Sequence, residues 1–231
     1  MSIILETKDL TKTYSGLVAN DNVDFTLNTG QIHALIGPNG AGKSTFVGMV
    51  SGRIPVSHGK VWFDGQEVTF KPAHTRIQMG MAYTFQITAI YSNLSVFENV
   101  SLALGTRDRE ECMQALDRVD LRSRATQTAG DLAYGHQRLL EIAMGIAQSP
   151  RLLILDEPTQ GLAESEIEGF NALIRSIAGE TTILLIEHNM NVVMALAQEI
   201  TVLDRGAVLA HGTPDEIKAD QRVQDAYLGT R

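Results

Sequence analysis

A glycine-rich run from Gly37 to Thr45 carries residue types that bind phosphate. It reads Gly-Pro-Asn-Gly-Ala-Gly-Lys-Ser-Thr and follows the apolar segment His33–Ile36, which is typical of a buried strand. Glycines let backbone N–H groups turn inward, and the helix that Lys43 opens presents its positive dipole end to an anion. The spacing predicts a phosphate-binding loop between a strand and a helix. The alternative is a glycine-rich turn that binds nothing.

The residues of this loop have different predicted roles. Lys43 is predicted to bridge the β- and γ-phosphates of a nucleotide as a point charge, and the Ser44 hydroxyl to be a Mg²⁺ ligand. Thr45 is predicted to add phosphate contacts, while Gly40 and Gly42 keep Cβ atoms out of the cradle. The predicted nucleotide-binding residues of the loop are Asn39, Gly40, Ala41, Gly42, Lys43, Ser44 and Thr45.

A pair of carboxylates follows a second apolar run. Asp156 and Glu157 come directly after Leu152–Leu155, which is too apolar to be anything but a buried strand. We expect Asp156 to hold Mg²⁺, through water, and Glu157 to polarise the attacking water. The alternative for the pair is a strand-end carboxylate that caps a loop.

One histidine lies where a ligand is expected. His188 follows Glu187 after the apolar run Thr182–Ile186, at the carboxyl end of a predicted parallel strand, where α/β sheets bind their ligands. It is predicted to sense the γ-phosphate, so the predicted catalytic residues are Glu157, His188 and Lys43. Four other histidines are predicted to be structural, namely His33, His58, His74 and His211.

A last motif, Leu132-Ala-Tyr-Gly-His-Gln-Arg138, begins a helical pattern. Taken in order, these motifs resemble the nucleotide-binding subunit of ATP-binding cassette (ABC) transporters over essentially the whole chain. The resemblance implies that Tyr14 stacks on adenine, at about 1–3 kcal/mol, and that Gln86 reaches the metal and links the ATPase core to a helical subdomain. The alternatives are a surface aromatic for Tyr14 and a buried amide for Gln86. The implied cofactors are ATP and Mg²⁺, with the metal near Ser44, Gln86 and Asp156.

The same segment resembles the family's signature motif, Leu-Ser-Gly-Gly-Gln, which binds the γ-phosphate of ATP held by a second subunit. Ala133 replaces the serine, Tyr134 the first glycine and His136 the glutamine, whereas Gly135 is kept. Backbone N–H groups and the helix dipole still favour an anion here. The missing hydroxyl removes one hydrogen bond of about 1.5–3 kcal/mol to a charged acceptor. A tyrosine here occurs in the branch of ABC importers for branched-chain amino acids and related polar solutes.

A second departure from the family lies beyond Glu157. The family usually has an aspartate after Gly-Leu in this loop, whereas this chain reads Gly161-Leu-Ala163. The role of that aspartate in communication between subunits is therefore not carried over to Ala163. Importers of this branch commonly use two different ATPase subunits, so the resemblance implies either a homodimer or a dimer with a paralogue.

The composition agrees with this resemblance. The chain has 231 residues, a net charge of −8 and a pI of about 5.2, which give no general reason to bind nucleic acid. Cys112 is its one cysteine, which excludes a disulfide within the chain and fits a reducing cytosol. Glu6 and Lys8 interrupt the apolar start, unlike a signal peptide, and no apolar stretch approaches a membrane span. We therefore expect a peripheral protein at the cytoplasmic face of the membrane, bound to separate permease subunits.

The elements that must position these motifs give an α/β fold. Hydrophobic patterns predict antiparallel strands, then helices, then buried parallel strands. The N-terminal strands are Leu5–Leu10, Val23–Leu27, Val61–Phe63 and Glu67–Phe70, with a hairpin turn at Asp64-Gly65; the helices include Val96–Leu104 and Glu110–Val119; the later elements are Leu152–Leu155, Ile183–Ile186, Ile200–Leu203, Ala207–Ala210 and Pro214–Lys218.

The resemblance implies one P-loop NTPase domain of the ABC cassette type over residues 1–231. Residues 1–86 and 150–231 are expected to form the parallel-sheet core with an N-terminal antiparallel β subdomain, and residues 87–149 the α-helical signature subdomain. The alternative for the helical part is an all-α insertion that packs on the core.

The function that follows is ATP hydrolysis that powers solute import, with a solute-binding protein as an indirect partner. Tyr134 favours branched-chain amino acids. The tail His211–Ile217 and Ala226–Gly229 also resembles the ATPase of a lipopolysaccharide exporter, which is the alternative within the class. A soluble ABC ATPase of DNA repair or of ribosomes is disfavoured, because the long coiled-coil insertions and the second cassette usual in those proteins are missing. A P-loop kinase or GTPase gives no reason for the signature segment.

Overall fold

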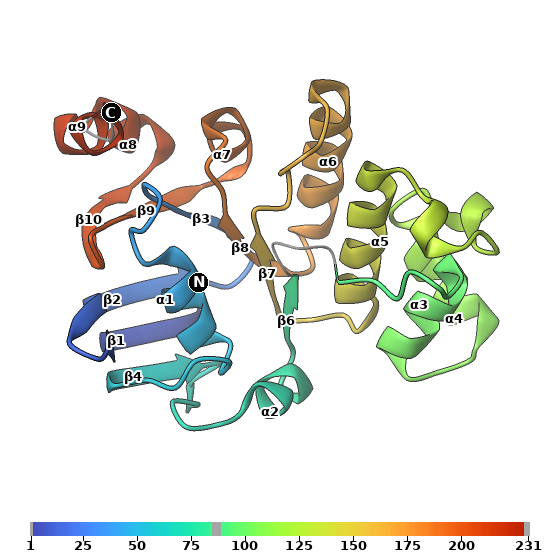
Figure 1. Ribbon diagram of the computed structural model, residues 1–231, viewed down its shortest axis with the longest axis horizontal. Helices are drawn as coiled ribbons and strands as arrows, with labels where there is room; N and C mark the ends of the chain where they lie inside the picture. The colour runs from blue at the N-terminus through green and yellow to red at the C-terminus, as the bar shows by residue number, and fades with distance from the viewer. Residues whose placement is uncertain (1, 85–88, 229–231) are drawn as a thin grey trace.

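The computed structural model describes residues 2–84 and 89–228, which form two β-sheets and a group of helices at one end of the molecule (Figure 1). Gln86, the predicted link between core and helices, lies outside the described residues. None of the helices within the described residues is long and apolar enough to cross a membrane.

The N-terminal strands form an antiparallel sheet, as predicted, and the order of its strands is β2-β1-β4-β5. Its members are β1 (Ile3–Tyr14), β2 (Leu17–Asn28), β4 (His58–Phe63) and β5 (Gln66–Glu67). Along β2, Val23, Phe25 and Leu27 are buried and alternate with exposed residues, the pattern of a strand with one covered face.

One predicted strand in this sheet, Glu67–Phe70, is wrong at three of its four residues. β5 pairs with β4 across the predicted turn, but it ends at Glu67 instead of continuing to Phe70. The Lys71 N–H donates to the Val68 carbonyl at 2.9 Å and so turns the chain. Pro72 follows and has no N–H for a strand ladder. The β-branched and aromatic residues of this stretch therefore did not decide its conformation.

The second sheet has six strands in the order β10-β9-β3-β8-β7-β6. These are β3 (Ile32–Ile36), β6 (Met81–Thr84), β7 (Leu152–Asp156), β8 (Thr182–Ile186), β9 (Glu199–Asp204) and β10 (Ala207–Gly212). β10 runs antiparallel to β9, whereas the other neighbouring strands are parallel. β3, β7 and β8 are buried throughout, because both faces of the sheet are covered.

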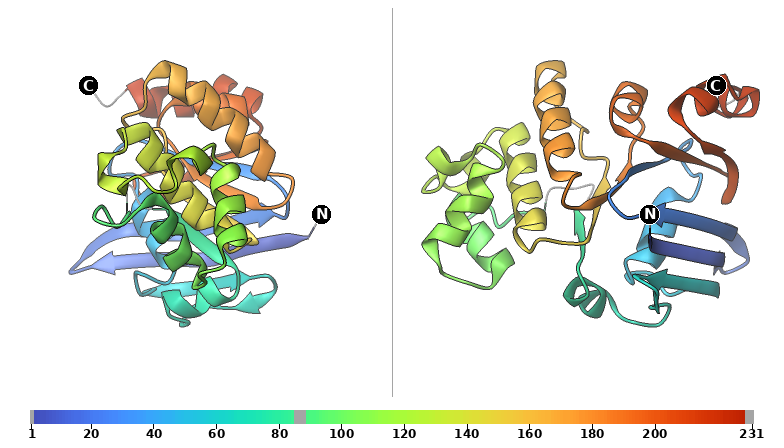
Figure 2. Two further views of the ribbon diagram at one scale, coloured as in Figure 1. Left: turned by 90° about the vertical axis from the view of Figure 1, so that its right-hand side faces the viewer. Right: turned by 180° about the vertical axis from the view of Figure 1, so that it is seen from behind.

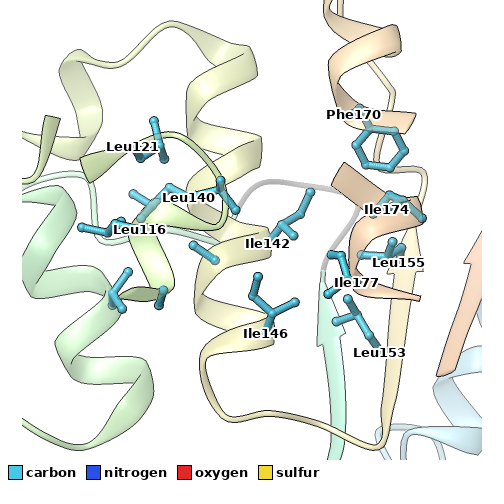
Figure 3. Close-up of a cluster of buried hydrophobic side chains, with 14 of the residues drawn as sticks. Leu116, Leu121, Leu140, Ile142, Ile146, Leu153, Leu155, Phe170, Ile174 and Ile177 are labelled. Atoms are coloured by element: carbon cyan, nitrogen blue, oxygen red, sulfur yellow. The ribbon is translucent and has the colours of Figure 1, made fainter. Parts of the chain in front are cut away.

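The two faces of this sheet pack on different layers. Leu152 and Ile154 of β7 contact a core that includes α1 (Lys43–Val50) and the antiparallel sheet. Leu153 and Leu155 point the other way and pack with Ile142 of α5 and Ile174 of α6 (Figure 3). α5 spans Tyr134–Ala147 and α6 spans Glu164–Ile177. α7 (Met190–Leu196), α8 (Pro214–Ala219) and α9 (Gln221–Leu228) complete the C-terminal part, and α2 (Ala73–Gln78) precedes β6.

The helical end of the molecule consists of α3 (Val96–Leu104), α4 (Arg109–Asp117) and α5, with short 3₁₀ turns at Arg122–Arg124 and Ala129–Asp131. It faces the viewer in the left view of Figure 2. The Ser95 hydroxyl accepts the Glu98 N–H at the start of α3, and the Glu98 carboxylate accepts the Ser95 N–H, which is a capping box. α3 has the bounds that were predicted, and α4 is two residues shorter at its C-terminal end.

Candidate functional site

The phosphate loop lies between β3 and α1, as its sequence predicted. At Gly42 the backbone has φ 98°, and a Cβ atom there would lie 2.5 Å from the carbonyl oxygen of Ala19. At Gly37 a Cβ atom would lie 2.1 Å from the Leu203 carbonyl oxygen. Neither site has room for a side chain, so these two glycines allow the loop to pack directly on β2 and β9.

Lys43 is held inside this loop. Its side chain is largely buried, and Nζ donates to the carbonyl oxygens of Gly37 at 2.6 Å and Pro38 at 3.1 Å. Burial lowers the pKa of Lys43, while the carboxylates of Glu157 and Asp156 act in the opposite direction. The fold thus brings the predicted phosphate ligand and the two predicted acids into one electrostatic environment.

A pocket of about 490 Å³ opens over the loop. It is lined by Leu17, Val18, Ala19, Asn39, Gly40, Ala41, Gly42, Lys43, Ser44, Thr45, Glu157 and Arg205. All seven predicted loop residues therefore share one cavity with Glu157. Arg205 and the start of β2 were missed by sequence reasoning, because only the fold places them beside the loop.

Tyr14 is not part of that lining among the described residues. It lies at the end of β1, its side chain is partly exposed, and the Lys12 ammonium is 4.9 Å from its ring centroid. Its neighbour across the hairpin, Leu17, does line the pocket. Adenine stacking on Tyr14 stays a prediction.

Asp156 is positioned by a partner from β6. The Tyr83 hydroxyl donates a hydrogen bond to Asp156 Oδ2, and the Arg53 guanidinium lies 3.7 Å from the centroid of the Tyr83 ring. Burial and the Asp156 carboxylate raise the pKa of Tyr83 well above its ordinary value, so the hydroxyl keeps its proton. The hydrogen bond orients the carboxylate, whose oxygen donors suit Mg²⁺ together with the Ser44 hydroxyl.

Glu157 and His188 face each other across the ends of β7 and β8. His188 Nδ1 is 3.9 Å from Glu157 Oε2, and the imidazole is half exposed whereas the carboxylate is mostly buried. Glu157 has φ 48°, and its N–H donates to the Ile186 carbonyl at 2.9 Å. A positive φ is uncommon for a residue with a Cβ and often marks a functional position. The structure brings the predicted base and the predicted γ-phosphate sensor together.

The signature segment lies at the start of α5. Ala133 is the residue before the helix, and its side chain makes no capping hydrogen bond. The Tyr134 ring packs over Gly161 in the loop after β7, where a Cβ atom would lie 2.8 Å from Cε1 of the tyrosine. Gly135 is close to the Glu166 carboxylate, and with His136 it lines a separate cavity of about 560 Å³.

This segment is not joined to the phosphate loop of its own chain. Figure 1 shows α5 and α1 on opposite sides of β7. The set Ala133, Tyr134, Gly135 and His136 therefore contributes no residue to the lining of the phosphate-loop pocket within the described chain.

The signature helix is nevertheless connected to the carboxylate loop through Arg138. This residue is almost fully buried, and its guanidinium pairs with Glu141 at 2.6 Å and donates to the Glu157 carbonyl at 3.1 Å. Sequence reasoning assigned no role to Arg138. No local pattern in the sequence could have found this contact, because Arg138 and Glu157 are 19 positions apart.

Comparisons with known proteins agree with this geometry. Residues 20–160 match the family model described as ABC transporter, and residues 207–231 match the model described as branched-chain amino acid ATP-binding cassette transporter. A solved nucleotide-free ATP-binding cassette from an ABC transporter shares the fold, with a TM-score of 0.89, 25% identity and 98% of this chain and 99% of that chain covered. An ATP-binding cassette in its ADP conformation has a TM-score of 0.91 at 24% identity over 99% of this chain and 100% of the other.

Curated relatives cover nearly the whole chain. It is 37% identical to the high-affinity branched-chain amino acid transport ATP-binding protein BraF of Pseudomonas aeruginosa, and 35% identical to LivG of Escherichia coli, which bears the same description, with 98% of each chain covered. It is 33% identical to the lipopolysaccharide export system ATP-binding protein LptB of Escherichia coli over 97% of both chains.

The phosphate loop, the strand-end carboxylates and the cassette fold define a P-loop ATPase. The chain belongs to the ABC transporter family, as its ATP-binding subunit, in which ATP hydrolysis is coupled to transport. The predicted family, fold class and enzyme class are thereby confirmed.

Proposed function

We propose that this chain is the ATPase subunit of an importer for branched-chain amino acids. The observation that carries the substrate class is the match of residues 207–231 to the branched-chain amino acid cassette model. BraF and LivG, whose names state this transport, are 37% and 35% identical. Tyr134 in the signature segment supports the same branch.

Two ATPase subunits form the working unit in this proposal. The N-terminus of α5 is an anion-binding end that does not meet its own phosphate loop (Figure 1). A head-to-tail pair places residues 132–138 of one subunit over ATP bound at residues 37–45 of the other. A cassette of the same fold, with a TM-score of 0.82 and 23% identity, forms a dimer bound to ADP and phosphate. The partner subunit is either a second copy or a paralogue.

Hydrolysis then follows from the arrangement around the pocket. The phosphates of ATP take the place of the loop carbonyls that now accept from Lys43 Nζ. Glu157 polarises the attacking water, and His188, with Nδ1 3.9 Å from Glu157 Oε2, contacts the γ-phosphate. Ser44 and Asp156 would hold Mg²⁺, which when bound neutralises charge on the phosphate oxygens. Closure of the dimer excludes other water from the reacting atoms.

The division of labour along the chain is also a proposal. Residues 1–86 and 150–231 form the nucleotide-binding core, and residues 87–149 form the helical signature subdomain that contacts the permease. Binding to permease subunits keeps the chain peripheral, at the cytoplasmic face of the membrane. A solute-binding protein delivers the amino acid to those subunits and has no contact with this chain.

Uptake of labelled leucine, isoleucine and valine by cells of the source organism tests the transport step. A chromosomal Glu157→Gln exchange is expected to abolish this uptake. The matched control is Glu180→Gln, because Glu180 is exposed and forms only a surface ion pair with Arg118. Uptake that survives Glu157→Gln, with lipopolysaccharide missing from the outer membrane, would favour the exporter that LptB represents.

A further inference from the structure

The carboxylate of Glu187, at the end of β8, is fully buried and accepts hydrogen bonds on both oxygens. Oε1 accepts from the Thr159 N–H at 3.0 Å and from the Thr159 hydroxyl. Oε2 accepts from the N–H groups of His188 at 2.8 Å and Asn189 at 3.0 Å. The four donors come from two different loops.

These two loops carry the groups that act on ATP. Thr159 lies two residues after Glu157 in the loop that follows β7, and His188 opens the loop that follows β8. His188 Nδ1 is 3.8 Å from Glu187 Oε2 and 3.9 Å from Glu157 Oε2, so the imidazole lies between two carboxylates. A shift of either loop would change the separation of Glu157 from His188.

Two acceptor oxygens are used in this arrangement, as a carboxylate provides. Burying a carboxylate is unfavourable unless its oxygens are hydrogen-bonded, and the four donors meet that condition. A glutamine of the same size has one acceptor oxygen and a donor NH₂ group. In its place, the amide group would face N–H groups of one of the two loops and push them away.

We propose that Glu187 is a positioning residue for ATP hydrolysis, which fixes the loops of Glu157 and His188 at their working separation. It rests on the roles given to those two residues under the proposed function. Glu187 is not among the described residues that line the phosphate-loop pocket. Its effect is therefore expected on turnover and not on ATP affinity.

The test is the steady-state ATPase of the purified transporter complex, captured on a tagged copy of this chain. Glu187→Gln is expected to lower kcat about 10–100-fold, the usual loss when a supporting partner of a reactive group is removed. KM for ATP and the affinity for a fluorescent ATP analogue should change less than about threefold, since the phosphate loop is untouched. Glu199→Gln is the matched control, because Glu199 begins β9 at the opposite end of the same sheet.

A second measurement separates positioning from a general structural role. The effects of residues that act as one unit are non-additive. In a protein that already carries His188→Ala, adding Glu187→Gln should therefore lower kcat by less than about a further threefold. The proposal would be overturned if the double variant lost kcat by the product of the two single losses. It would also be overturned if Glu187→Gln alone left kcat unchanged, or changed kcat and KM equally. If Glu187→Gln fails to fold, Thr159→Val decides: a kcat at least about threefold lower with KM unchanged supports positioning, and wild-type kcat refutes it. Normal ATPase in the wild-type complex without leucine uptake would instead count only against the transported solute.

Discussion

The guanidinium group of Arg138 donates a hydrogen bond to the backbone carbonyl of Glu157, with 3.1 Å between Nη2 and the oxygen. Arg138 belongs to the signature helix, whose N-terminus faces the nucleotide of a second subunit in the proposed dimer. Glu157 has the strained φ of 48° and is the predicted base of its own subunit. One buried side chain thus connects the signature helix to the backbone of the predicted base.

The pair formed by Arg138 and Glu141 gives a prediction for stability. Arg138→Leu leaves the Glu141 carboxylate buried without its guanidinium partner, and we expect the free energy of unfolding to fall by about 3–5 kcal/mol. The double change Arg138→Leu with Glu141→Leu removes both charges and should recover most of that loss. Urea denaturation measures both variants.

ATPase activity separates the two roles of Arg138. The double variant should stay at least about tenfold less active than the wild type, because the contact with the Glu157 carbonyl is still missing. Full activity in a stable double variant would mean that this contact has no part in turnover.

The parts that sequence reasoning predicted are those with a local signal. The loop from Gly37 to Thr45 and the carboxylates at the end of β7 were located because their spacing and the apolar residues before them specify short stretches of backbone. β7 and β8 were evident as continuous apolar runs, since both faces are buried.

The parts that escaped depend on packing between distant segments. The hydrogen bonds from Thr159 to Glu187 join residues 28 positions apart, and the contact of Arg138 with Glu157 joins residues 19 positions apart, and no periodicity encodes them. The end of β5 at Glu67 was missed because a turn overrode strand propensity. That Leu17 and not Tyr14 lines the phosphate-loop pocket within the described chain likewise depends on how the hairpin lies on the loop.

Gly42→Ala should weaken nucleotide binding far more than a glycine-to-alanine change at another position with a similar positive φ. At φ 98° an alanine costs about 1–2 kcal/mol of backbone strain. At Gly42 the new Cβ would also lie 2.5 Å from the Ala19 carbonyl oxygen, so the loop must move. We expect at least about tenfold weaker binding of a fluorescent ATP analogue, which corresponds to about 1.4 kcal/mol.

The control for this change is Gly16→Ala. Gly16 has φ 93°, close to that of Gly42, but a Cβ atom there meets no heavy atom within 4 Å. It should show the backbone strain as a lower unfolding free energy and leave the affinity for ATP within about twofold. Equal losses of affinity in both variants would show that strain, and not the clash with β2, sets the effect.

Glu157→Gln should trap an ATP-bound dimer. The amide cannot take a proton from water, so turnover should fall by about 10²–10⁴-fold while the phosphate loop still binds ATP. Size-exclusion chromatography with Mg²⁺ and ATP is expected to show a dimer for Glu157→Gln with whichever partner subunit the protein uses. Adding Lys43→Ala should abolish this dimer, because the phosphates lose their buried cation. Rapid ATP hydrolysis by Glu157→Gln would remove Glu157 from the role of base.

His33 gives a prediction for the pH dependence of stability. Its imidazole is fully buried beside Thr201 and Glu199, and it stacks on His211 with ring centroids 5.6 Å apart. Burial, and secondarily His211, lower the pKa of His33 to about 3. The unfolded chain, with a pKa near 6.5, therefore binds a proton below that pH while the folded chain does not. Stability is retained above about pH 6.5 and is lost as the pH falls toward 3, by about 2 kcal/mol at pH 5.

Urea unfolding at pH 7.5 and pH 5 measures this loss. His33→Gln removes the titrating group at the same place. The loss of unfolding free energy between pH 7.5 and pH 5 should therefore be about 2 kcal/mol smaller in this variant than in the wild type. His58→Gln is the control, because His58 is exposed at the start of β4 and should leave the difference unchanged. If the wild type and His33→Gln lose the same free energy on acidification, the buried imidazole does not govern stability at low pH, and carboxylates elsewhere in the fold must account for the loss.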